Sequence, residues 1–452
     1  MTVKRNVRTG LAPVRHFSIV IGAVAAFAAA PLSFAAPAEA RTVAVARDQG
    51  VEDFYKARHD RLLWFQPGQA AAAHQLVALL ETASFDGLDG ERYRPGSLAK
   101  ALRRAASGHP RDLRRADIAL SEAFVAYARD LRNAPAAGMQ FVDPTLRPSP
   151  PYARALLVMA ASAPSLSQFI TNMGWMNPAY APLRRALAAG KYRDSRQRDL
   201  IRINMERARV LPVAMPRYVI VNAAAQRLDM YEGGRVVDSM RVVVGKEKPK
   251  DRTPMLASFL DHADLNPYWN VPPDLAAERI APNVLKEGLG YLKRGRYEVL
   301  SDWGEAAELV DPASVDWQAV ADGRIEVRLR QLPGPANSLG KVKFSFSNPY
   351  GVYLHDTPDK QLLTEDTRLF SGGCIRLEDA ARFGQWLFGR PLKATSKEPE
   401  IEVPLERPVP IYVTYLTAVP NGSSVTFLDD VYGWDEQRLA QLARSGERVA
   451  AR

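Results

Sequence analysis

Two side chains in this sequence have the types and spacing for nucleophilic catalysis. They are the single cysteine, Cys374, and His355, nineteen residues before it. A thiolate can attack a carbonyl carbon, an imidazole can take and return the proton, and backbone N–H groups can hold the oxyanion. Cys374 ends the run Ser371-Gly372-Gly373-Cys374. We therefore predict Cys374 as nucleophile, His355 as base, and the amides of Gly372, Gly373 and Cys374 as the oxyanion hole.

Neighbouring elements must position these groups. Strand alternation over 351–355 places Gly351, Tyr353 and His355 on one face, with His355 at the strand end. Apolar spacing over 377–388 predicts a helix that ends at Gly389. We expect the thiol at or just before that helix's N-terminus, where the helix dipole favours thiolate. The alternative is an inert, buried structural thiol.

Composition narrows the function classes. The chain has 452 residues, of which 47% are hydrophobic, so it can form two or three domains and is not wholly disordered. One cysteine is too few for an intrachain disulfide, a thiolate zinc site, an iron–sulfur cluster or a CxxC redox pair. No metal-ligand or nucleotide signature occurs either. We therefore predict no metal and no cofactor.

The N-terminus has the pattern of an export signal. A basic start precedes an apolar stretch at 17–30 and the site Ala38-Glu39-Ala40. We predict a signal peptide over 1–40, cleaved after Ala40, then a linker at 41–50 and a periplasmic protein; an uncleaved membrane anchor is the alternative. The remaining 412 residues hold 56 Lys and Arg against 49 Asp and Glu. This small excess includes no basic run, so we expect no nucleic-acid partner.

The pattern predicts an α+β protein with two domains. Residues 51–211 read as a helical scaffold domain, with its strongest helix at 112–131. Residues 212–415 read as a mainly β catalytic domain, with strands at 218–222, 227–231, 236–245, 342–346 and 351–355 and a hairpin turn at 232–235. A helix and loop capping insertion is expected at about 274–335. Residues 416–452 form a C-terminal segment.

These motifs resemble the YkuD-type L,D-transpeptidases. The step from His355 to Ser371-Gly372-Gly373-Cys374-Ile375-Arg376 is similar to their active-site signature. The order of Arg217-Tyr-Val-Ile-Val-Asn222, Asn266-Pro-Tyr-Trp-Asn-Val-Pro-Pro273, His355-Asp-Thr-Pro358 and Asp429-Asp430-Val-Tyr432 resembles the larger, periplasmic, YcbB-like branch. There are two departures. Gly372 stands where the family usually has histidine, and 187–211 leaves no room for the peptidoglycan-binding domain of larger relatives.

The resemblance implies a peptidoglycan L,D-transpeptidase that makes 3→3 cross-links through a cysteine thioester on tetrapeptide stems, releasing D-Ala. We expect Tyr353, Trp269 and Arg376 to contact substrate. The alternative for Tyr353 and Trp269 is core packing, and for Arg376 a salt bridge to Glu378 or Asp379. Ser371 is expected to support the loop. Asp356 is expected to orient His355 through its backbone carbonyl, with a solvated carboxylate.

Other functions remain open at this point. The same thioester could pass to water, giving a carboxypeptidase or endopeptidase, or to a protein lysine, giving protein anchoring. A non-catalytic wall-binding protein is the third alternative. The expected partners are peptidoglycan stems as donor and acceptor, together with cell-wall synthesis proteins, and we expect a monomer.

Overall fold

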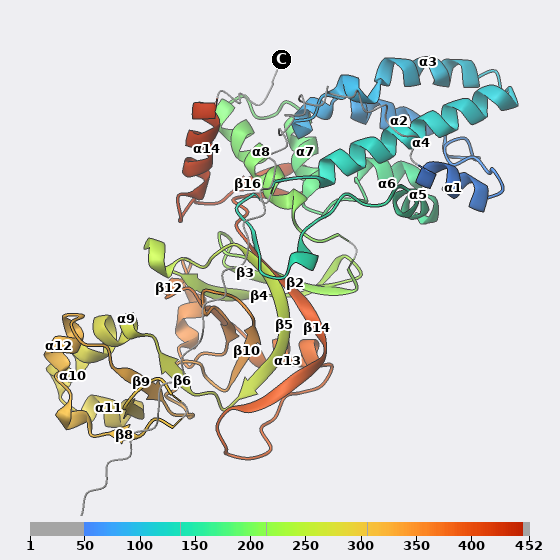
Figure 1. The fold of residues 1–452 in the computed structure, drawn as a ribbon. Helices are drawn as coiled ribbons and strands as arrows, with labels where there is room; N and C mark the ends of the chain where they lie inside the picture. Colours follow the sequence, from blue (N-terminus) through green and yellow to red (C-terminus); the bar gives the residue numbers. More distant parts are fainter. Residues whose placement is uncertain (1–48, 136, 214, 305, 446–452) are drawn as a thin grey trace, which may run out of the picture. The chain divides into compact units, whose positions relative to one another are not determined.

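The computed structural model describes residues 49–135, 137–213, 215–304 and 306–445 (Figure 1). The predicted signal peptide and all of the predicted linker except Gln49 and Gly50 lie outside these residues. Gln49 and Gly50 open the first helix. Among the described residues, no helix combines the length and the apolar content that a membrane crossing needs.

Helices make up the N-terminal half of the described chain. The helix predicted at 112–131 is confirmed as the longest of them, and it starts at Pro110, where the His109 ring accepts a hydrogen bond from the Arg111 N–H. The helices are α1 (Gln49–Ala57), α2 (Ala70–Glu81), α3 (Pro95–Ala105), α4 (Pro110–Arg132), α5 (Ala153–Ser162), α6 (Leu166–Thr171), α7 (Tyr180–Ala188) and α8 (Ser195–Arg209).

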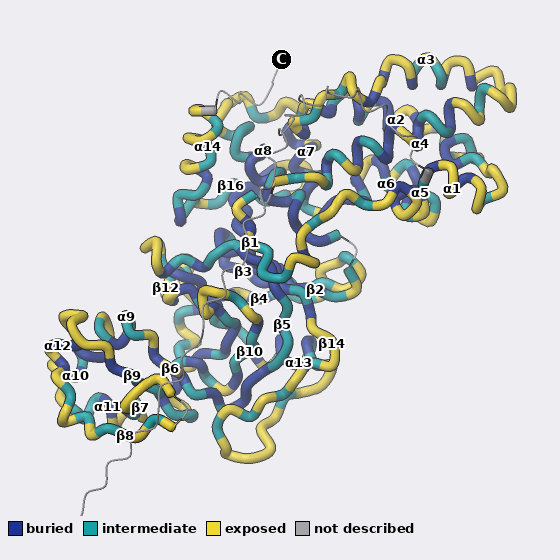
Figure 2. Tube along the Cα trace, in the orientation of Figure 1, coloured by how far each residue is buried: buried dark blue, intermediate teal, exposed yellow. Residues whose placement is uncertain are grey.

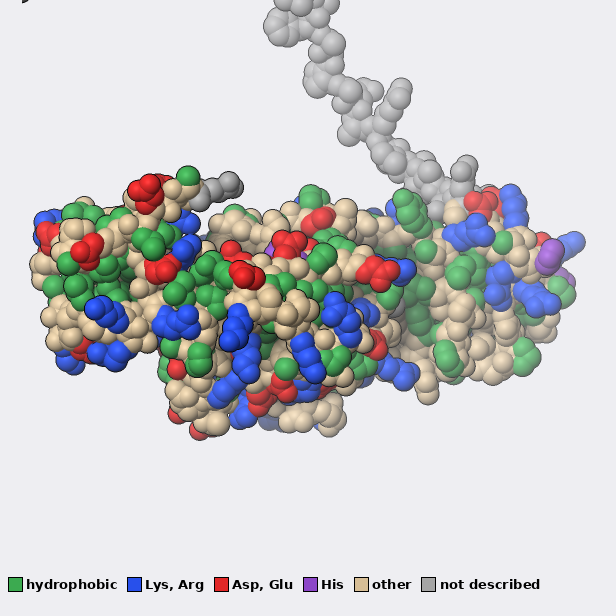
Figure 3. Space-filling view, turned by 90° about the horizontal axis from the view of Figure 1, so that it is seen from below, with side chains coloured by type: hydrophobic (Ala, Val, Ile, Leu, Met, Phe, Trp, Pro, Cys, Tyr) green, Lys and Arg blue, Asp and Glu red, His purple; other side chains and the backbone are tan. Residues whose placement is uncertain are grey.

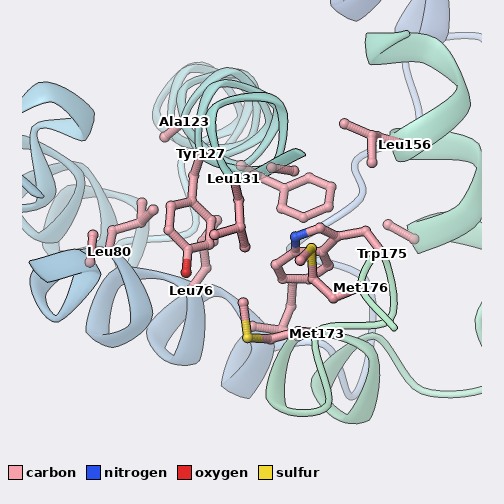
Figure 4. Packing of buried hydrophobic residues seen from close by; sticks show 14 of the residues in the cluster. Leu76, Leu80, Ala123, Tyr127, Leu131, Leu156, Met173, Trp175 and Met176 are labelled. Carbon is pink, nitrogen blue, oxygen red and sulfur yellow. The ribbon is translucent and has the colours of Figure 1, made fainter. Parts of the chain in front are cut away.

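The helical half has its own aromatic core. Phe124 of α4 meets Trp175 edge to face, with ring centroids 4.9 Å apart, and Tyr127 packs beside them (Figure 4). Asp86 is buried here, where it accepts hydrogen bonds from Tyr127 and Tyr180 at 2.7 Å and pairs with Arg184. Because a buried carboxylate is stable only with these partners in place, the Asp86 contacts favour one arrangement of the surrounding helices.

The second half is built on one large sheet. The strands predicted at 218–222, 227–231 and 236–245, and the hairpin turn between the last two, are confirmed. The strands are β1 (Gln140–Phe141), β2 (Arg217–Asn222), β3 (Arg227–Glu232), β4 (Arg235–Gly245), β5 (Leu256–Leu265), β10 (Val342–Phe346), β11 (Leu354–His355), β12 (Leu369–Ser371), β13 (Ile375–Leu377) and β14 (Ile401–Thr414).

This sheet closes on itself. Its order is β1-β5-β10-β11-β13-β4-β3-β2-β14, and β14 also pairs with β5. Of the two closing strands, β5 is mostly buried, whereas β14 is buried mainly over its last residues, 409–414, and is exposed or half-buried before them (Figure 2). Helix α13 (Ala380–Phe388) packs on the sheet through Phe383 and Phe344, whose ring centroids lie 4.9 Å apart, and ends at Gly389 as predicted.

The capping insertion forms a small subdomain with its own core, in which Trp269 and Leu329 are buried. To the predicted helices and loops the structure adds a four-stranded sheet, ordered β6-β9-β7-β8. The strands are β6 (Trp269–Val271), β7 (Tyr297–Leu300), β8 (Leu309–Val310) and β9 (Arg328–Gln331). The helices are α9 (Pro273–Leu275), the π-helix Ala276–Ile280, α10 (Ala281–Glu287), α11 (Gly290–Gly295) and α12 (Trp317–Ala321).

The C-terminal segment returns to the helical half. It contains β15 (Ala418–Asn421), β16 (Ser424–Phe427) and α14 (Trp434–Ser445). Ala418 and Val425 join the core of the helical half. Asp435 of α14 pairs with Arg207 of α8 at 2.5 Å, and both side chains are buried. The segment therefore fastens the two halves together.

Candidate active site

Cys374 lies in a tight loop between β12 and β13. The prediction that a helix follows it directly is wrong: strand β13 comes first, and α13 begins only at Ala380, where Asp379 caps it. Residues 375–377 belong to a strand pairing with β4 and β11, which the spacing of residues along the sequence does not reveal. Strand β13 therefore separates the thiol from the N-terminus of α13.

Hydrogen bonds hold this loop from both sides. Buried Ser371 donates its hydroxyl to the Cys374 carbonyl at 2.6 Å and accepts the Gly373 N–H at 3.2 Å. Buried Thr253 donates to the Gly373 carbonyl at 2.8 Å and accepts the Gly245 N–H at 2.8 Å. Ser371 is thus engaged as a loop support. The Gly373 amide, one of the three predicted oxyanion donors, is thus engaged by Ser371 in this conformation.

The two glycines differ. Gly373 has φ +117°, a conformation that side-chain-bearing residues rarely adopt. Gly372 is exposed and not so constrained, since a Cβ built there would meet only Leu275 Cδ1 at 3.9 Å. The loop therefore needs glycine at position 373 and not at position 372.

The Cys374 thiol is half-buried beside Gly351 and Tyr353. Its Sγ lies 3.7 Å from the Gly351 carbonyl oxygen. Burial raises the pKa of the thiol, and hydrogen bonds from Tyr353 and the positive charges of Arg376 and Lys343 oppose this rise. The net effect is an upward shift, so the resting group is a thiol.

His355 lies on the neighbouring strand. Strand β11 pairs in parallel with β13, with His355 opposite Arg376, and Tyr353 packs against the His355 ring at 5.7 Å. The buried imidazole directs Nδ1 to the Asp356 carbonyl at 2.5 Å. Because a carbonyl only accepts, Nδ1 carries the proton and Nε2 keeps its lone pair. Burial, with the charge of Arg376, lowers the pKa of His355 to about 3, so the imidazole is neutral.

The Asp356 carboxylate is not solvated, contrary to expectation. It accepts hydrogen bonds from Lys360 Nζ at 2.8 Å and from the Lys341 N–H at 3.0 Å. Although burial opposes it, these contacts lower the pKa of Asp356. The carboxylate thereby fixes the backbone that presents its carbonyl to His355.

This chain matches two protein families. Residues 49–187 match the Scaffold domain, and residues 216–406 match the YkuD L,D-transpeptidase catalytic domain. Residues 216–406 are thus similar to the YkuD L,D-transpeptidase catalytic domains. A Haemophilus influenzae protein, named as a candidate L,D-transpeptidase, is 31% identical over 248 residues, which cover 53% of this chain. The chain thus spans about half of that relative, 49% of its length.

One solved structure is also similar. It is an L,D-transpeptidase from Mycobacterium smegmatis, 13% identical, covering 44% of this chain and 58% of its own, with a TM-score of 0.20.

Two predicted substrate contacts of the L,D-transpeptidase domain lie in different places. Tyr353 lies at the thiol and also packs against the cap core. Trp269 is buried in the cap core beside Tyr297, so the core-packing alternative describes its surroundings. The structure therefore brings Tyr353 to Cys374 and gives Trp269 a packing role in the cap.

Arg376 pairs with neither of the residues named as alternatives. Its partner is Asp359 at 3.4 Å, whereas Glu378 binds Arg241 and Asp379 caps α13. Its Nε is buried and has no hydrogen-bond partner among the described residues. The guanidinium of Arg376 thus has bonding capacity left beside Cys374.

The cap lies close to the catalytic loop. Leu275 of α9 faces Gly372, and Lys250 pairs with Asp274, at 3.4 Å, and with Glu278 of the cap. The L,D-transpeptidase domain and its cap are thus joined across the site by charge pairs.

Sequence reasoning missed two residues of the site. Thr253 supports the loop from 120 positions away, and Lys343 lies over the Tyr353 ring at 5.7 Å and pairs with Asp264 at 2.9 Å. Neither stands in a motif, and both act through pairings between distant segments. Strand alternation places Lys343 on a known face of β10, but only the sheet order reveals what that face meets.

His262, Asp264 and Glu402 form a group with metal-ligand atoms within 4.8 Å of one another. Lys343 Nζ already lies 2.9 Å from Asp264 Oδ2, and His262 Nδ1 is bonded to Asp261 at 2.5 Å. The ammonium group thus supplies the positive charge that Asp264 requires.

On the face seen in Figure 3, Lys and Arg side chains lie among Asp and Glu side chains.

Proposed function

We propose that this protein is a peptidoglycan L,D-transpeptidase that forms 3→3 cross-links through a thioester on Cys374. The observation that carries the proposal is the pairing of β11 with β13, which sets Tyr353 and His355 beside the Cys374 loop. His355 offers an unprotonated Nε2 because Nδ1 is held by the Asp356 carbonyl. The family match supports the reaction class.

The first half-reaction forms the acyl-enzyme. Nε2 of His355 takes the thiol proton as Sγ of Cys374 attacks the carbonyl at the L-centre of meso-diaminopimelate in a tetrapeptide stem. The amides of Gly372 and Cys374 stabilise the oxyanion. As the intermediate collapses, the C–N bond to D-Ala breaks, His355 returns the proton to the leaving amine, and the stem remains as a thioester.

The second half-reaction transfers the stem. The amine at the D-centre of a second stem attacks the thioester carbon, and His355 removes the proton from the attacking nitrogen. The C–S bond breaks, an amide forms, and the proton returns to the thiol. Leu275 of the cap, which faces Gly372, brings an apolar side chain to the loop, and closer contact of the cap with the bound stem would favour this amine over hydrolysis.

Intact mass spectrometry with a defined tetrapeptide donor tests the proposal. We expect the full chain to gain the mass of the stem minus D-Ala, and Cys374→Ala to gain nothing while keeping its melting temperature. Ser371→Ala is the companion variant, since it removes the neighbouring hydroxyl and keeps the thiol. An adduct that persists in Cys374→Ala would falsify the proposal.

Adding an acceptor stem then separates the alternatives. Dimers with 3→3 linkage support transpeptidation, tripeptides alone indicate hydrolysis, and adducts on added protein lysines indicate anchoring.

We also propose that the chain acts in the periplasm after cleavage behind Ala40. N-terminal sequencing of the protein from the periplasm should begin at Arg41.

A further inference from the structure

A groove lies between the helical half and the C-terminal helix α14, and its smaller cavity reaches the catalytic domain at Pro254, Met255 and Tyr350. Two neighbouring cavities form it, with volumes of about 390 and 860 Å³, both in the range typical of ligand sites. They share five lining residues, which makes them one continuous feature, here called the junction groove: Ala137, Gly138, Glu206, Arg438 and Gln441.

Helices α8 and α14 lie side by side along this groove (Figure 1). Its smaller cavity also contacts the loop between β10 and β11 through Tyr350. Tyr350 directly precedes Gly351, whose carbonyl oxygen lies 3.7 Å from Cys374 Sγ. Standard backbone dimensions then put the Tyr350 Cα within about 10 Å of the sulfur. The backbone of one residue that lines the groove therefore lies close to the nucleophile.

Aromatic rings line this end of the groove. Tyr350 is 55% exposed, and its hydroxyl meets the Gln140 side chain at 2.5 Å. The Trp434 ring packs edge to face against two tyrosine rings, with its centroid 4.8 Å from that of Tyr415 and 5.0 Å from that of Tyr432. Such rings offer flat apolar surfaces with a polar edge, fixed before any ligand arrives.

Planar polar groups accompany the rings. Gln437 and Gln441 project from α14 with exposed side chains, and each amide can both donate and accept hydrogen bonds. Several charges in the groove lining have ion-pair partners: Arg438 binds Glu206 at 3.1 Å, Arg202 binds Asp199 at 2.9 Å, and buried Asp86 binds Arg184. The groove thus favours a neutral ligand with apolar faces and many hydroxyl and amide groups over a polyanion.

We propose that the junction groove binds the glycan backbone of peptidoglycan, a polymer of N-acetylated amino sugars. This inference rests on the proposed function for the identity of the polymer. Sugar rings have apolar C–H faces for Tyr350 and Trp434 and a rim of hydroxyl and acetamido groups for the glutamines. Three residues of an extended stem span about 10 Å. A glycan seated at Tyr350 could therefore deliver its third stem residue to Cys374.

Binding of glycan strands stripped of their stem peptides tests this site without any catalysis. Strands with a fluorescent end label are titrated with the full chain carrying Cys374→Ala, and anisotropy is recorded. We expect binding, and a loss of about tenfold or more in affinity when Gln437→Ala and Gln441→Ala are combined, since two hydrogen bonds are removed. Arg444→Ala is the matched control on α14, because Arg444 lies outside the lining of both cavities.

A second measurement separates this proposal from the proposed function. In chains that retain Cys374, the double glutamine variant should acylate on a soluble tetrapeptide at the normal rate and lose activity on intact sacculi. Absence of any acyl-enzyme in the unaltered chain would defeat the proposed function and leave strand binding measurable. The groove proposal would be overturned if the glycan strands did not bind. It would also be overturned if the double variant, at an unchanged melting temperature, bound them as tightly as the chain that keeps both glutamines.

Discussion

The proposed nucleophile and base are both neutral at rest. Burial raises the pKa of Cys374 and lowers that of His355 to about 3, so thiol and imidazole coexist at neutral pH. A thiolate and imidazolium pair, as the expected helix dipole would favour, is not the resting state. Charge therefore develops only as the proton moves, next to Tyr353, Arg376 and Lys343, which favour the thiolate.

Tyr353→Phe should make the thiol less reactive. The change removes the Tyr353 side-chain hydrogen bond to Sγ. In the unaltered chain this hydrogen bond lowers the pKa of Cys374, so the variant should have a higher pKa at the thiol. A hydrogen bond to a charged group contributes about 1.5–3 kcal/mol. We expect the alkylation rate with iodoacetamide, measured from pH 6 to 10, to shift to higher pH and to fall about tenfold at pH 7.

The control for this variant is Tyr152→Phe, at a tyrosine that is 86% exposed. Its profile should match that of the unaltered chain. An identical profile for Tyr353→Phe would show that the hydroxyl does not act on the sulfur.

At the scale of elements, the loop that carries Cys374 is a turn fixed by side-chain hydrogen bonds. Ser371 donates one from the start of the loop, and Thr253 donates another from the segment before β5. Tyr432 adds a third support, because its hydroxyl donates to the Gly245 carbonyl at 2.7 Å beside Thr253. The position of Cys374 therefore depends on segments distant in sequence.

The glycine pair in this loop gives a matched comparison. Gly373→Ala should destabilise the fold by roughly 1–3 kcal/mol, because alanine is strained at φ +117°. Gly372→Ala should cost less than about 0.5 kcal/mol, since its Cβ meets only Leu275 at 3.9 Å. Urea unfolding of both variants measures the difference. Equal losses would contradict this account of the loop.

Sequence patterns predicted the elements whose partners are near in the chain. The hairpin of β3 and β4 has its own turn, and α4 shows its apolar stripe over six turns of helix. The order of catalytic motifs also predicted the loop around Cys374. Sequence patterns did not predict the elements whose structure depends on pairing with a distant segment. Residues 375–377, for example, form a strand because β4 and β11 pair with them. The short cap strands and the role of Thr253 were missed for the same reason.

At the scale of the whole molecule, the C-terminal segment couples the two halves. Arg207 of α8 binds the Asp435 carboxylate and also donates to the Tyr415 carbonyl at 2.9 Å. Asn204 contacts Thr417 at 2.9 Å nearby. These buried polar contacts make the helical half and the catalytic domain depend on each other for stability.

Arg207→Met should weaken this coupling. Removing one partner leaves Asp435 buried and unpaired, at a cost of about 3–5 kcal/mol. We expect calorimetry to show a lower melting temperature and separate transitions for the two halves. Arg196→Ala is the matched control, because Arg196 pairs with Glu436 across the same helices but at the surface. It should cost less than about 1 kcal/mol. Similar losses in both variants would argue against the buried pair as the coupling element.

The closure of the catalytic sheet limits how a peptide can be recognised. Many proteins capture an extended peptide by letting it join the outer strand of a sheet, which reads the backbone and needs regular L-residues. Here the pairing of β14 with β5 closes the main path of the sheet. Among the described strands of this sheet, only the short β1 and β12 pair with a single neighbour. Inhibitors that imitate a long β-strand would accordingly find a docking edge only at these two short strands. For the proposed function, compounds that imitate the shape and charge of the stem are the better starting point.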